Sequence, residues 1–389
     1  MFAIPILFAL LIGAIVLYLD LHLYLRPVPG DLDTAIQEQL EAAKLPGAVV
    51  AVIQDNRIVF IKGYGYANLE QKRPVTPDTI FQIASVSKLV TATTLMRLYE
   101  QGKFGLDDDI NAYLPFSVRN PQYPEASITF RMLLAHTSSI ADGPSYESTY
   151  TLGKSADSPL ALGDYLRDYF TPGGMYYDAQ KNFSADPPGA VYAYSNVGFG
   201  LVGYLAERIA GQPFEQLSQQ EVFAPLGMTS SAWFHRDVDP LRWAMPYQYQ
   251  IISRSYVPLG AYGFATYPDG ALKTSANDFV RFLSPFINNG QTLDGNPYLK
   301  PETVAEMLRV QYPESGETNG LAWMVNPTNA LHTGGDPGVS TLAVINFAKH
   351  RGLVIFTNSG GAETPGMLRS TIGFQLFVEK VSSLVKNLP

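Results

Sequence analysis

The chain has 389 residues, of which 46% are hydrophobic and 16% charged, a composition typical of an ordinary globular protein. Its net charge is −8 and it contains no basic run, which argues against a nucleic-acid partner, because phosphates are met by clustered Lys and Arg. The absence of cysteine excludes disulfides, thiolate metal sites and a cysteine nucleophile.

Residues 1–25 are dominated by an uncharged apolar run from Phe2 to Leu19. At about 1.5 Å per residue this run approaches the ~30 Å hydrocarbon core of a bilayer. We expect an uncleaved membrane anchor, because no basic segment precedes the run and no clear cleavage site precedes Arg26. A cleaved signal peptide and a buried helix are the alternatives. We expect the anchored domain outside the cytoplasm, although the position of Arg26 after the run opposes this orientation.

Apolar spacing and turn residues predict a stiff linker at 26–31 and one domain at 32–389. In its first half we expect helices at 31–43, from 85 to about 100, from 129, near 160–170 and at 197–209, and strands at 48–53 and 58–64 around a turn at 55–56. In its second half we expect helices at 276–286 and 365–385, and strands at 321–325, 341–347 and 353–357.

These elements predict an α/β fold of the α+β type. Because strands come from both ends of the chain, we expect a mostly antiparallel sheet flanked by helices, with a helical insertion or subdomain at about 103–275. Residues 143–188 are rich in Tyr, Gly, Ser, Asp and Pro. Such a segment is either a wall of an active site or a disordered insert, and its aromatic side chains favour the wall.

Ser85 and Lys88 are the first candidate site residues. They lie three positions apart at the start of a helical pattern, so their side chains point to one side of the helix. A serine hydroxyl needs a base to become a nucleophile, and a desolvated lysine can be that base, because burial lowers its pKa. An isolated match is also compatible with a helix cap and a surface lysine, but the apolar flanks of Lys88 argue against this reading. Ser87 is the competing nucleophile and points elsewhere on a helix.

Tyr194 and Asn196 are the next candidates, after a Pro-Gly turn and before a predicted helix. A tyrosine hydroxyl near an ammonium group can shuttle protons, and an amide can orient a substrate carbonyl or the lysine. A strand-edge tyrosine followed by a turn asparagine is the alternative, and Tyr192 is the neighbour most easily confused with Tyr194.

The stretch His332-Thr333-Gly334-Gly335 lies between predicted strands and is the third candidate. Glycines let a substrate backbone approach closely, and a backbone N–H here could complete an oxyanion hole with the N–H of Ser85. Taken alone, the stretch is more simply interpreted as an ordinary glycine turn.

Together, and in this order, the three stretches resemble the serine β-lactamase and penicillin-binding-protein-like superfamily. The closer likeness is to its branch of class C β-lactamases, D-alanyl-D-alanine carboxypeptidases and esterases. The resemblance covers roughly residues 32–385 and extends to the stretches at 106–115, 128–139 and 225–228. It implies an antiparallel sheet flanked by helices, with a helical subdomain.

The resemblance also implies a role for each candidate by its position. Ser85 would be the acylated nucleophile, Lys88 its base and Tyr194 the proton relay to the leaving group. Asn196 would orient the substrate. The substrate-binding stretch would be His332, Thr333, Gly334 and Gly335, with the N–H groups of Ser85 and Gly335 as the oxyanion hole.

His332 departs from the family's β-lactamases, which usually carry lysine at this position. A neutral histidine attracts a substrate carboxylate little, so the departure favours an esterase, amidase or peptidase over antibiotic hydrolysis. His136 is a tempting triad member, but its equivalent in the family is structural, and a triad would need its own serine and carboxylate partners. The few histidines are scattered, so we expect no metal site, and the expected chemistry needs no organic cofactor.

The sequence thus predicts a serine hydrolase that acts through an acyl-enzyme on an ester, an amide or a D-amino-acid-containing substrate. The expected partners are a small molecule or a cell-envelope substrate and, through the N-terminal helix, a membrane. A β-lactamase is one alternative. The other is a membrane-anchored penicillin-binding or sensor domain without turnover. The sequence predicts neither the substrate nor the oligomeric state.

Overall fold

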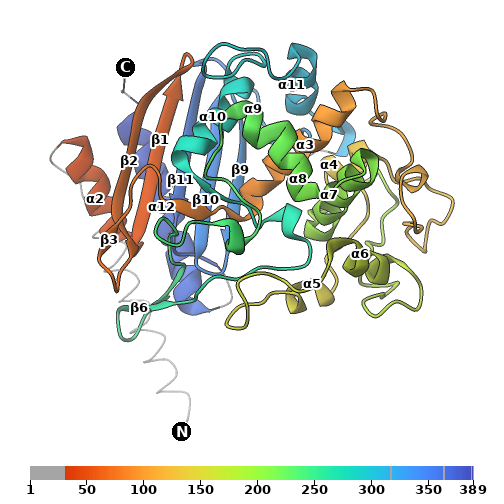
Figure 1. Cartoon of the computed structure of the whole chain (residues 1–389), viewed down its shortest axis with the longest axis horizontal. Helices are drawn as coiled ribbons and strands as arrows, with labels where there is room; N and C mark the ends of the chain where they lie inside the picture. The colour runs from red at the N-terminus through yellow and green to blue at the C-terminus, as the bar shows by residue number, and fades with distance from the viewer. Residues whose placement is uncertain (1–30, 316–317, 362–363, 387, 389) are drawn as a thin grey trace, which may run out of the picture.

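The computed structural model describes residues 31–315, 318–361, 364–386 and 388. Its largest sheet has seven strands in the order β3-β2-β1-β11-β10-β9-β8, and all neighbours are antiparallel. The strands are β1 (Gly47–Gln54), β2 (Arg57–Asn68), β3 (Arg73–Pro74), β8 (Met324–Val325), β9 (Asn329–Asp336), β10 (Val339–Asn346) and β11 (Arg351–Thr357). Because β1 pairs with β11, strands from both ends of the domain meet inside the sheet (Figure 1). This confirms the predicted antiparallel α+β fold.

β1 is buried on both faces of the sheet. Its side chains alternate between two cores, as the period of a strand requires. Val49 and Ala51 belong to the larger core, whereas Val50 and Val52 belong to the smaller one. This is why the strand is a continuous apolar run rather than an alternation of polar and apolar residues.

The hairpin between β1 and β2 turns at Asp55 and Asn56, as predicted. Both residues have positive φ, 46° and 62°. This backbone twist suits a two-residue hairpin loop, and Asp and Asn adopt it at lower cost than other side chains with a Cβ.

Two helices, α2 (Leu32–Ala42) and α12 (Pro365–Val385), pack on one face of the sheet and enclose the smaller core (Figure 1). On the opposite face, α10 (Ala276–Ile287) packs against β1 and β11. The larger core also contains α3 (Ser87–Glu100) and α7 (Asn196–Ala210), which pack on each other. α7 begins where the Ser195 hydroxyl accepts from the N–H of Gly198, and it ends at Gly211, where φ is 71°.

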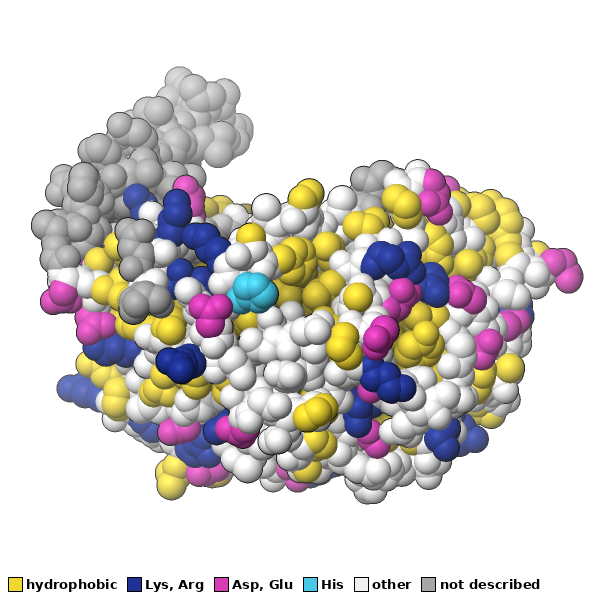
Figure 2. Space-filling view, turned by 90° about the horizontal axis from the view of Figure 1, so that it is seen from above, with side chains coloured by type: hydrophobic (Ala, Val, Ile, Leu, Met, Phe, Trp, Pro, Cys, Tyr) yellow, Lys and Arg dark blue, Asp and Glu magenta, His cyan; other side chains and the backbone are white. Residues whose placement is uncertain are grey.

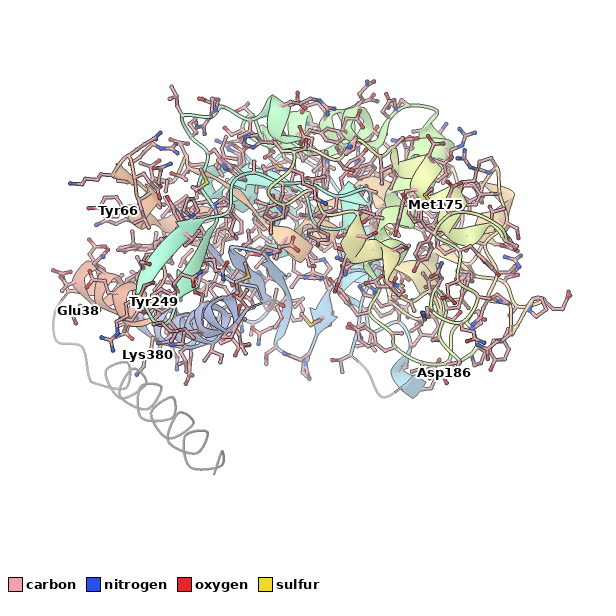
Figure 3. All side chains as sticks on the ribbon, turned by 90° about the horizontal axis from the view of Figure 1, so that it is seen from below. Glu38, Tyr66, Met175, Asp186, Tyr249 and Lys380 are labelled. Carbon is pink, nitrogen blue, oxygen red and sulfur yellow. The ribbon has the colours of Figure 1, made fainter. Side chains whose placement is uncertain are left out.

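The chain between α3 and α10 consists mainly of short elements. Besides α7, its α-helices are α4 (Phe130–Leu134), α5 (Ser145–Ser148), α6 (Leu162–Phe170), α8 (Phe214–Ser218) and α9 (Ala224–Leu226), and α11 (Pro301–Leu308) follows α10. The small sheets pair β4 (Ile80–Gln82) with β7 (Lys273–Ser275), and β5 (Tyr247–Gln250) with β6 (Ser255–Pro258). Figure 3 shows Met175 and Asp186 of this region at the end of the molecule opposite Glu38 of α2 and Lys380 of α12.

The aromatic segment 143–188 is packed, so the alternative of a disordered insert is wrong. It contains α5 and α6, and Tyr146, Tyr165 and Tyr169 are buried in the larger core. Asn182 ties the segment together, because its amide donates to the carbonyls of Tyr169 (2.9 Å) and Tyr176 (2.8 Å).

Two predicted boundaries are corrected by the structure. Only Met324–Val325 of the strand expected at 321–325 is extended, because Ala322 has φ of 67° and its N–H donates to Leu134 rather than to a strand. The glycine stretch 332–335 was predicted to lie between strands. It lies instead within β9, where it pairs with β10. Glycine-rich sequence masks this strand because it lacks the β-branched residues typical of strands.

Among the residues that the structure describes, no helix is long and apolar enough to cross a membrane. The predicted anchor at residues 1–25 and most of the predicted linker at 26–31 lie outside the described residues. The anchor and the extracytoplasmic location therefore stay predictions.

Candidate active site

Ser85 does not lie in the helix itself but in a 3-10 turn, Ala84–Val86, that joins β4 to α3. Ala84 has φ of 48°, a left-handed conformation that is unfavourable for a residue with a Cβ and occurs often at functional sites. The preceding residue, Ile83, holds the turn in place. Its N–H donates to Leu272 O (2.9 Å), and its carbonyl accepts from the Thr341 hydroxyl (2.7 Å).

Gly334 lets β9 run directly beside this turn. A Cβ at Gly334 would lie 2.5 Å from the carbonyl oxygen of Ile83 and 2.3 Å from Oγ1 of Thr341. No side chain fits in this space, so the glycine is required by the close approach of two backbones. A Cβ at Gly335, in contrast, would meet nothing within 4 Å.

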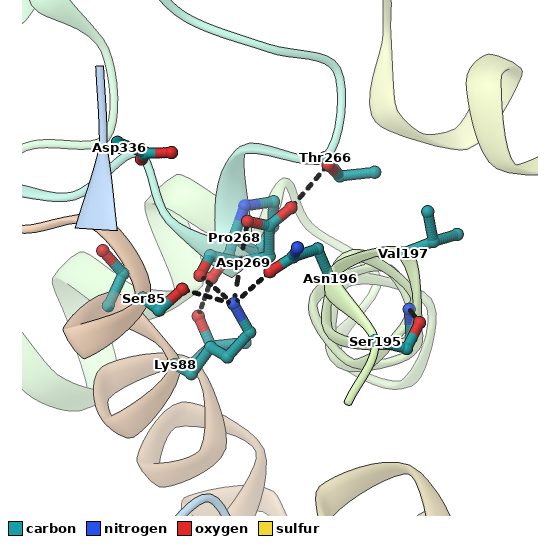
Figure 4. A network of polar contacts seen from close by, with 12 residues as sticks. Ser85, Lys88, Ser195, Asn196, Val197, Thr266, Pro268, Asp269 and Asp336 are labelled. Atoms are coloured by element: carbon teal, nitrogen blue, oxygen red, sulfur yellow. Dashed lines mark hydrogen bonds and ion pairs between the residues drawn. The ribbon is translucent and has the colours of Figure 1, made fainter. Parts of the chain in front are cut away.

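Lys88 is completely buried, and its ammonium group faces Ser85 (Figure 4). Its Nζ donates to Ser85 Oγ (3.1 Å), Asn196 Oδ1 (2.7 Å) and the Asp269 carbonyl (2.8 Å). Burial acts to lower the pKa of Lys88, but the nearby charges of Tyr194 and Asp269 outweigh it, so the pKa is raised. Three acceptors around one nitrogen match the three donors of an ammonium ion.

Ser87, the competing nucleophile, has a structural position. Its side chain is fully buried and its Oγ accepts from the backbone N–H of Leu272 (3.2 Å). This contact and the contact of Ile83 with the carbonyl of Leu272 fasten both sides of the Ser85 turn to one segment.

The ring centre of Tyr194 lies 4.9 Å from Lys88 Nζ and 6.4 Å from the ring centre of His332. Burial raises the pKa of Tyr194, and the charge of Lys88 opposes that rise. The ring stacks on His136 at 4.4 Å, and His136 Nδ1 accepts from the N–H of Ser195 (3.1 Å). His136 thus orients the tyrosine stretch, and burial lowers its pKa well below the usual range, so it is neutral.

Asp142 anchors the same stretch and carries no signal in the sequence. Its carboxylate accepts from the Ser195 hydroxyl (3.0 Å), the Asn196 backbone and side-chain N–H groups (3.0 and 2.9 Å) and the Val197 N–H (2.9 Å). The contacts with the backbone N–H groups satisfy free donors at the start of α7, where negative charge is favoured. The side-chain contact turns the Asn196 amide oxygen toward Lys88.

His332 is buried beside the pocket and neutral. Its pKa is lowered to about 3, first by burial and then by the charge of Lys88. The ring Nδ1 lies 2.7 Å from the Thr333 carbonyl, which can only accept, so Nδ1 carries the proton and Nε2 is an acceptor.

The edge of β9 is open beside Ser85. β8 pairs only with Leu331 and Ala330, so from His332 onward β9 has β10 as its one strand neighbour among the described residues. Ser85 N–H lies in the first turn of a helix, where backbone N–H groups have no helical partner. Gly335 lies on the neighbouring strand, and both residues line the same pocket.

The pocket has a volume of about 290 Å³, and Figure 2 shows a hollow floored by hydrophobic side chains. Its described lining residues are Ser85, Leu134, His136, Tyr192, Tyr194, Asn319, Gly320, Ala322, Trp323, Met324, His332, Thr333 and Gly335. None of these is Lys, Arg, Asp or Glu. The structure therefore brings the predicted Ser85, Tyr194, His332, Thr333 and Gly335 to one cavity, whereas Lys88 and Asn196 lie behind it and Gly334 spaces the backbones.

Within the described part of the chain, no three His, Asp or Glu side chains form a group that could hold a metal ion. The groups that face one another at the site are the hydroxyl of Ser85, the amine of Lys88 and the phenol of Tyr194. A serine, a lysine three residues later and a tyrosine around one cleft, on an antiparallel sheet with helices on both faces, define the S-x-x-K class of proteins.

The chain belongs to the Beta-lactamase family, whose model matches residues 32–373. It is 25% identical over 353 residues to Penicillin-binding protein 4* of Bacillus subtilis, covering 86% of this chain and 72% of that protein. It is 23% identical over 347 residues to protein flp of Staphylococcus aureus, covering 87% of this chain and 64% of that protein. The solved D-amino acid amidase of Ochrobactrum anthropi SV3 superposes with a TM-score of 0.65 at 22% identity, covering 91% of this chain and 99% of the amidase.

Proposed function

We propose that the chain is a serine hydrolase that transfers an acyl group to Ser85 and then to water. The observation that carries the proposal is the 3.1 Å contact between Lys88 Nζ and Ser85 Oγ at the floor of an open pocket. Lys88 first loses a proton to water, and its neutral amine then takes the proton of Ser85 Oγ as that oxygen attacks the acyl carbon. The proton is held by the Lys88–Tyr194 pair. Tyr194 relays the proton to the leaving group, and water then attacks the acyl carbon and frees Ser85.

The N–H groups of Ser85 and Gly335 are the proposed oxyanion hole, because both residues line the pocket from adjacent elements. Asn196 holds Lys88 through its amide oxygen, and its role is therefore to orient the base. Thr333 and His332 offer polar groups on the open edge of β9, where an extended acyl chain can lie.

We further propose that the preferred substrates are esters or amides whose acyl group carries no carboxylate. The described pocket lining offers no cation, and neutral His332 presents an acceptor rather than a positive charge. A carboxylate that enters this apolar pocket would lose water without a counter-ion, which is costly. The similarity to a D-amino acid amidase supports amides of amino acids as one such class.

The test compares p-nitrophenyl butyrate with mono-p-nitrophenyl succinate, which differ by a methyl group against a carboxylate. We expect kcat/KM to be at least 10-fold higher for the butyrate, and a D-amino-acid amide to be cleaved faster than a chromogenic cephalosporin. Ser85→Ala should abolish all turnover and leave the melting temperature unchanged. Turnover that survives Ser85→Ala overturns the proposed nucleophile, and a preference for the cephalosporin favours the β-lactamase alternative.

The penicillin-binding or sensor alternative predicts a different time course. A domain that only traps its ligand gives one burst of product per chain and then stops, whereas a hydrolase continues. Linear release beyond one equivalent of p-nitrophenol therefore separates the two functions.

A further inference from the structure

Asp269 is a buried carboxylate beside Lys88 that belongs to none of the motifs predicted from the sequence. It lies in a 3-10 turn, Tyr267–Asp269, and only 1% of its surface is exposed. Its backbone carbonyl accepts from Lys88 Nζ (2.8 Å), and its Oδ1 lies 3.8 Å from the same nitrogen (Figure 4). The ammonium group of Lys88 therefore faces both the backbone carbonyl and the side-chain carboxylate of one residue, Asp269.

The donors around this pair indicate which partner holds the proton. Lys88 Nζ has three acceptors within hydrogen-bond distance, as an ammonium ion requires. Asp269 accepts from the hydroxyls of Thr266 (2.5 Å) and Tyr146 (3.3 Å), as a carboxylate does. Burial raises the pKa of Asp269, and the charge of Lys88 and the hydrogen bond from Thr266 oppose the rise. The geometry is that of a buried ion pair, which is stable only when its remaining polar atoms are satisfied.

The aromatic segment 143–188 extends this network away from the nucleophile. The hydroxyls of Tyr146 and Tyr150 lie 3.1 Å apart, and Tyr150 donates to Asp336 at 2.8 Å. Asp336 ends β9, the strand that carries the predicted substrate edge. The segment 143–188 thus connects Asp269, the counter-ion of Lys88, to Asp336 at the C-terminal end of β9.

We propose that Asp269 is a positioning residue that holds Lys88 in place and in its protonated resting form through its carboxylate and its carbonyl. This inference rests on the proposed function, in which Lys88 must give up a proton before it can accept the one from Ser85. Asp269 then sets the pH at which the neutral amine appears. The other titratable groups that face Lys88 are Tyr194, Asp142, His136 and His332, and Asp269 itself also faces Tyr146, Tyr150 and Asp336.

The test is the pH profile of kcat/KM for p-nitrophenyl butyrate with Asp269→Asn. Asparagine keeps the backbone carbonyl, the side-chain shape and an acceptor for Thr266. It removes the charge and replaces the other carboxylate oxygen by an NH₂ group. Without the anion the neutral amine forms at lower pH, so we expect the rising limb to move down by about 1–3 pH units. A merely structural role lowers kcat/KM at every pH and leaves the limb in place.

Asp278→Asn is the matched control, because Asp278 is also a buried carboxylate but accepts from the Ser230 N–H and the Ser231 hydroxyl. It should lower the melting temperature and leave the limb where it is. Asp269→Ser also removes the charge and keeps a hydroxyl as an acceptor, so a downward shift of the rising limb is expected even if Asp269→Asn does not fold.

The outcomes separate the two proposals. An unshifted or upward-shifted limb in Asp269→Asn, or in Asp269→Ser where the former does not fold, overturns the role of Asp269 while the wild-type activity still stands. A wild-type chain that forms no acyl-enzyme overturns the proposed function itself.

Discussion

Gly334→Ala tests whether the backbone of β9 fixes the position of Ser85. The new Cβ would lie 2.5 Å from the Ile83 carbonyl oxygen, about 1 Å short of an ordinary contact between heavy atoms. The Ile83–Ala84 backbone cannot retreat freely, since its hydrogen bonds to Leu272 and Thr341 hold it on both sides. We expect a loss of about 1–3 kcal/mol in the free energy of unfolding. Because Ser85 follows directly, a shift of about 1 Å should lower kcat/KM by about 10²-fold.

Chemical denaturation and ester hydrolysis measure the two effects. Gly335→Ala is the control for stability, since its Cβ meets nothing within 4 Å and the fold should be unchanged. If Gly334→Ala retains wild-type stability and wild-type kcat/KM, the backbone contact does not position the nucleophile, and the account of the turn is wrong.

Two predictions concern His332. His332→Lys introduces a cation at the pocket. The kcat/KM for mono-p-nitrophenyl succinate, divided by that for p-nitrophenyl butyrate, should therefore rise about 10-fold or more. An unchanged ratio would show that this position does not select for charge. The second concerns pH: the pKa of His332 is about 3 in the folded chain, below its ordinary unfolded value of about 6.5. Between these values the unfolded chain binds the extra proton, so the free energy of unfolding should fall as pH drops from about 6.5 toward 3. In His332→Gln the fall should be shallower, and an equally steep curve in urea titrations across this window contradicts the assignment.

The sequence predicted those parts of the fold that depend on local periodicity. Strong apolar patterns mark β1, α7, α10 and α12, and the three helices also have clear N-caps. Each element lies close to where it was expected. The β9 strand was missed because it contains glycines where strands usually carry branched side chains, and the need for one of them, Gly334, comes from a tertiary contact with the Ser85 turn. The left-handed Ala322 likewise breaks an apolar run that reads as a strand.

The candidate site shows the same difference between residues recognisable from a local motif and residues whose role depends on tertiary contacts. Ser85, Lys88 and Tyr194 could be proposed because each belongs to a short motif with a known chemical logic. Asp142 and Asp269 could not, because each is a single acidic residue whose partner lies far along the chain, 54 positions away for Asn196 and 181 for Lys88. A carboxylate acquires a role in such a site only when the fold places it beside its donors.

The most direct test of the account is to locate the acyl group. The chain is mixed with p-nitrophenyl butyrate, quenched in acid within the first turnover, and analysed by intact mass and by peptide mapping. We predict one butyryl group per chain, on Ser85, and no adduct in Ser85→Ala. A chain that hydrolyses the ester with no adduct, or with the adduct on Ser87 or another residue, contradicts the account.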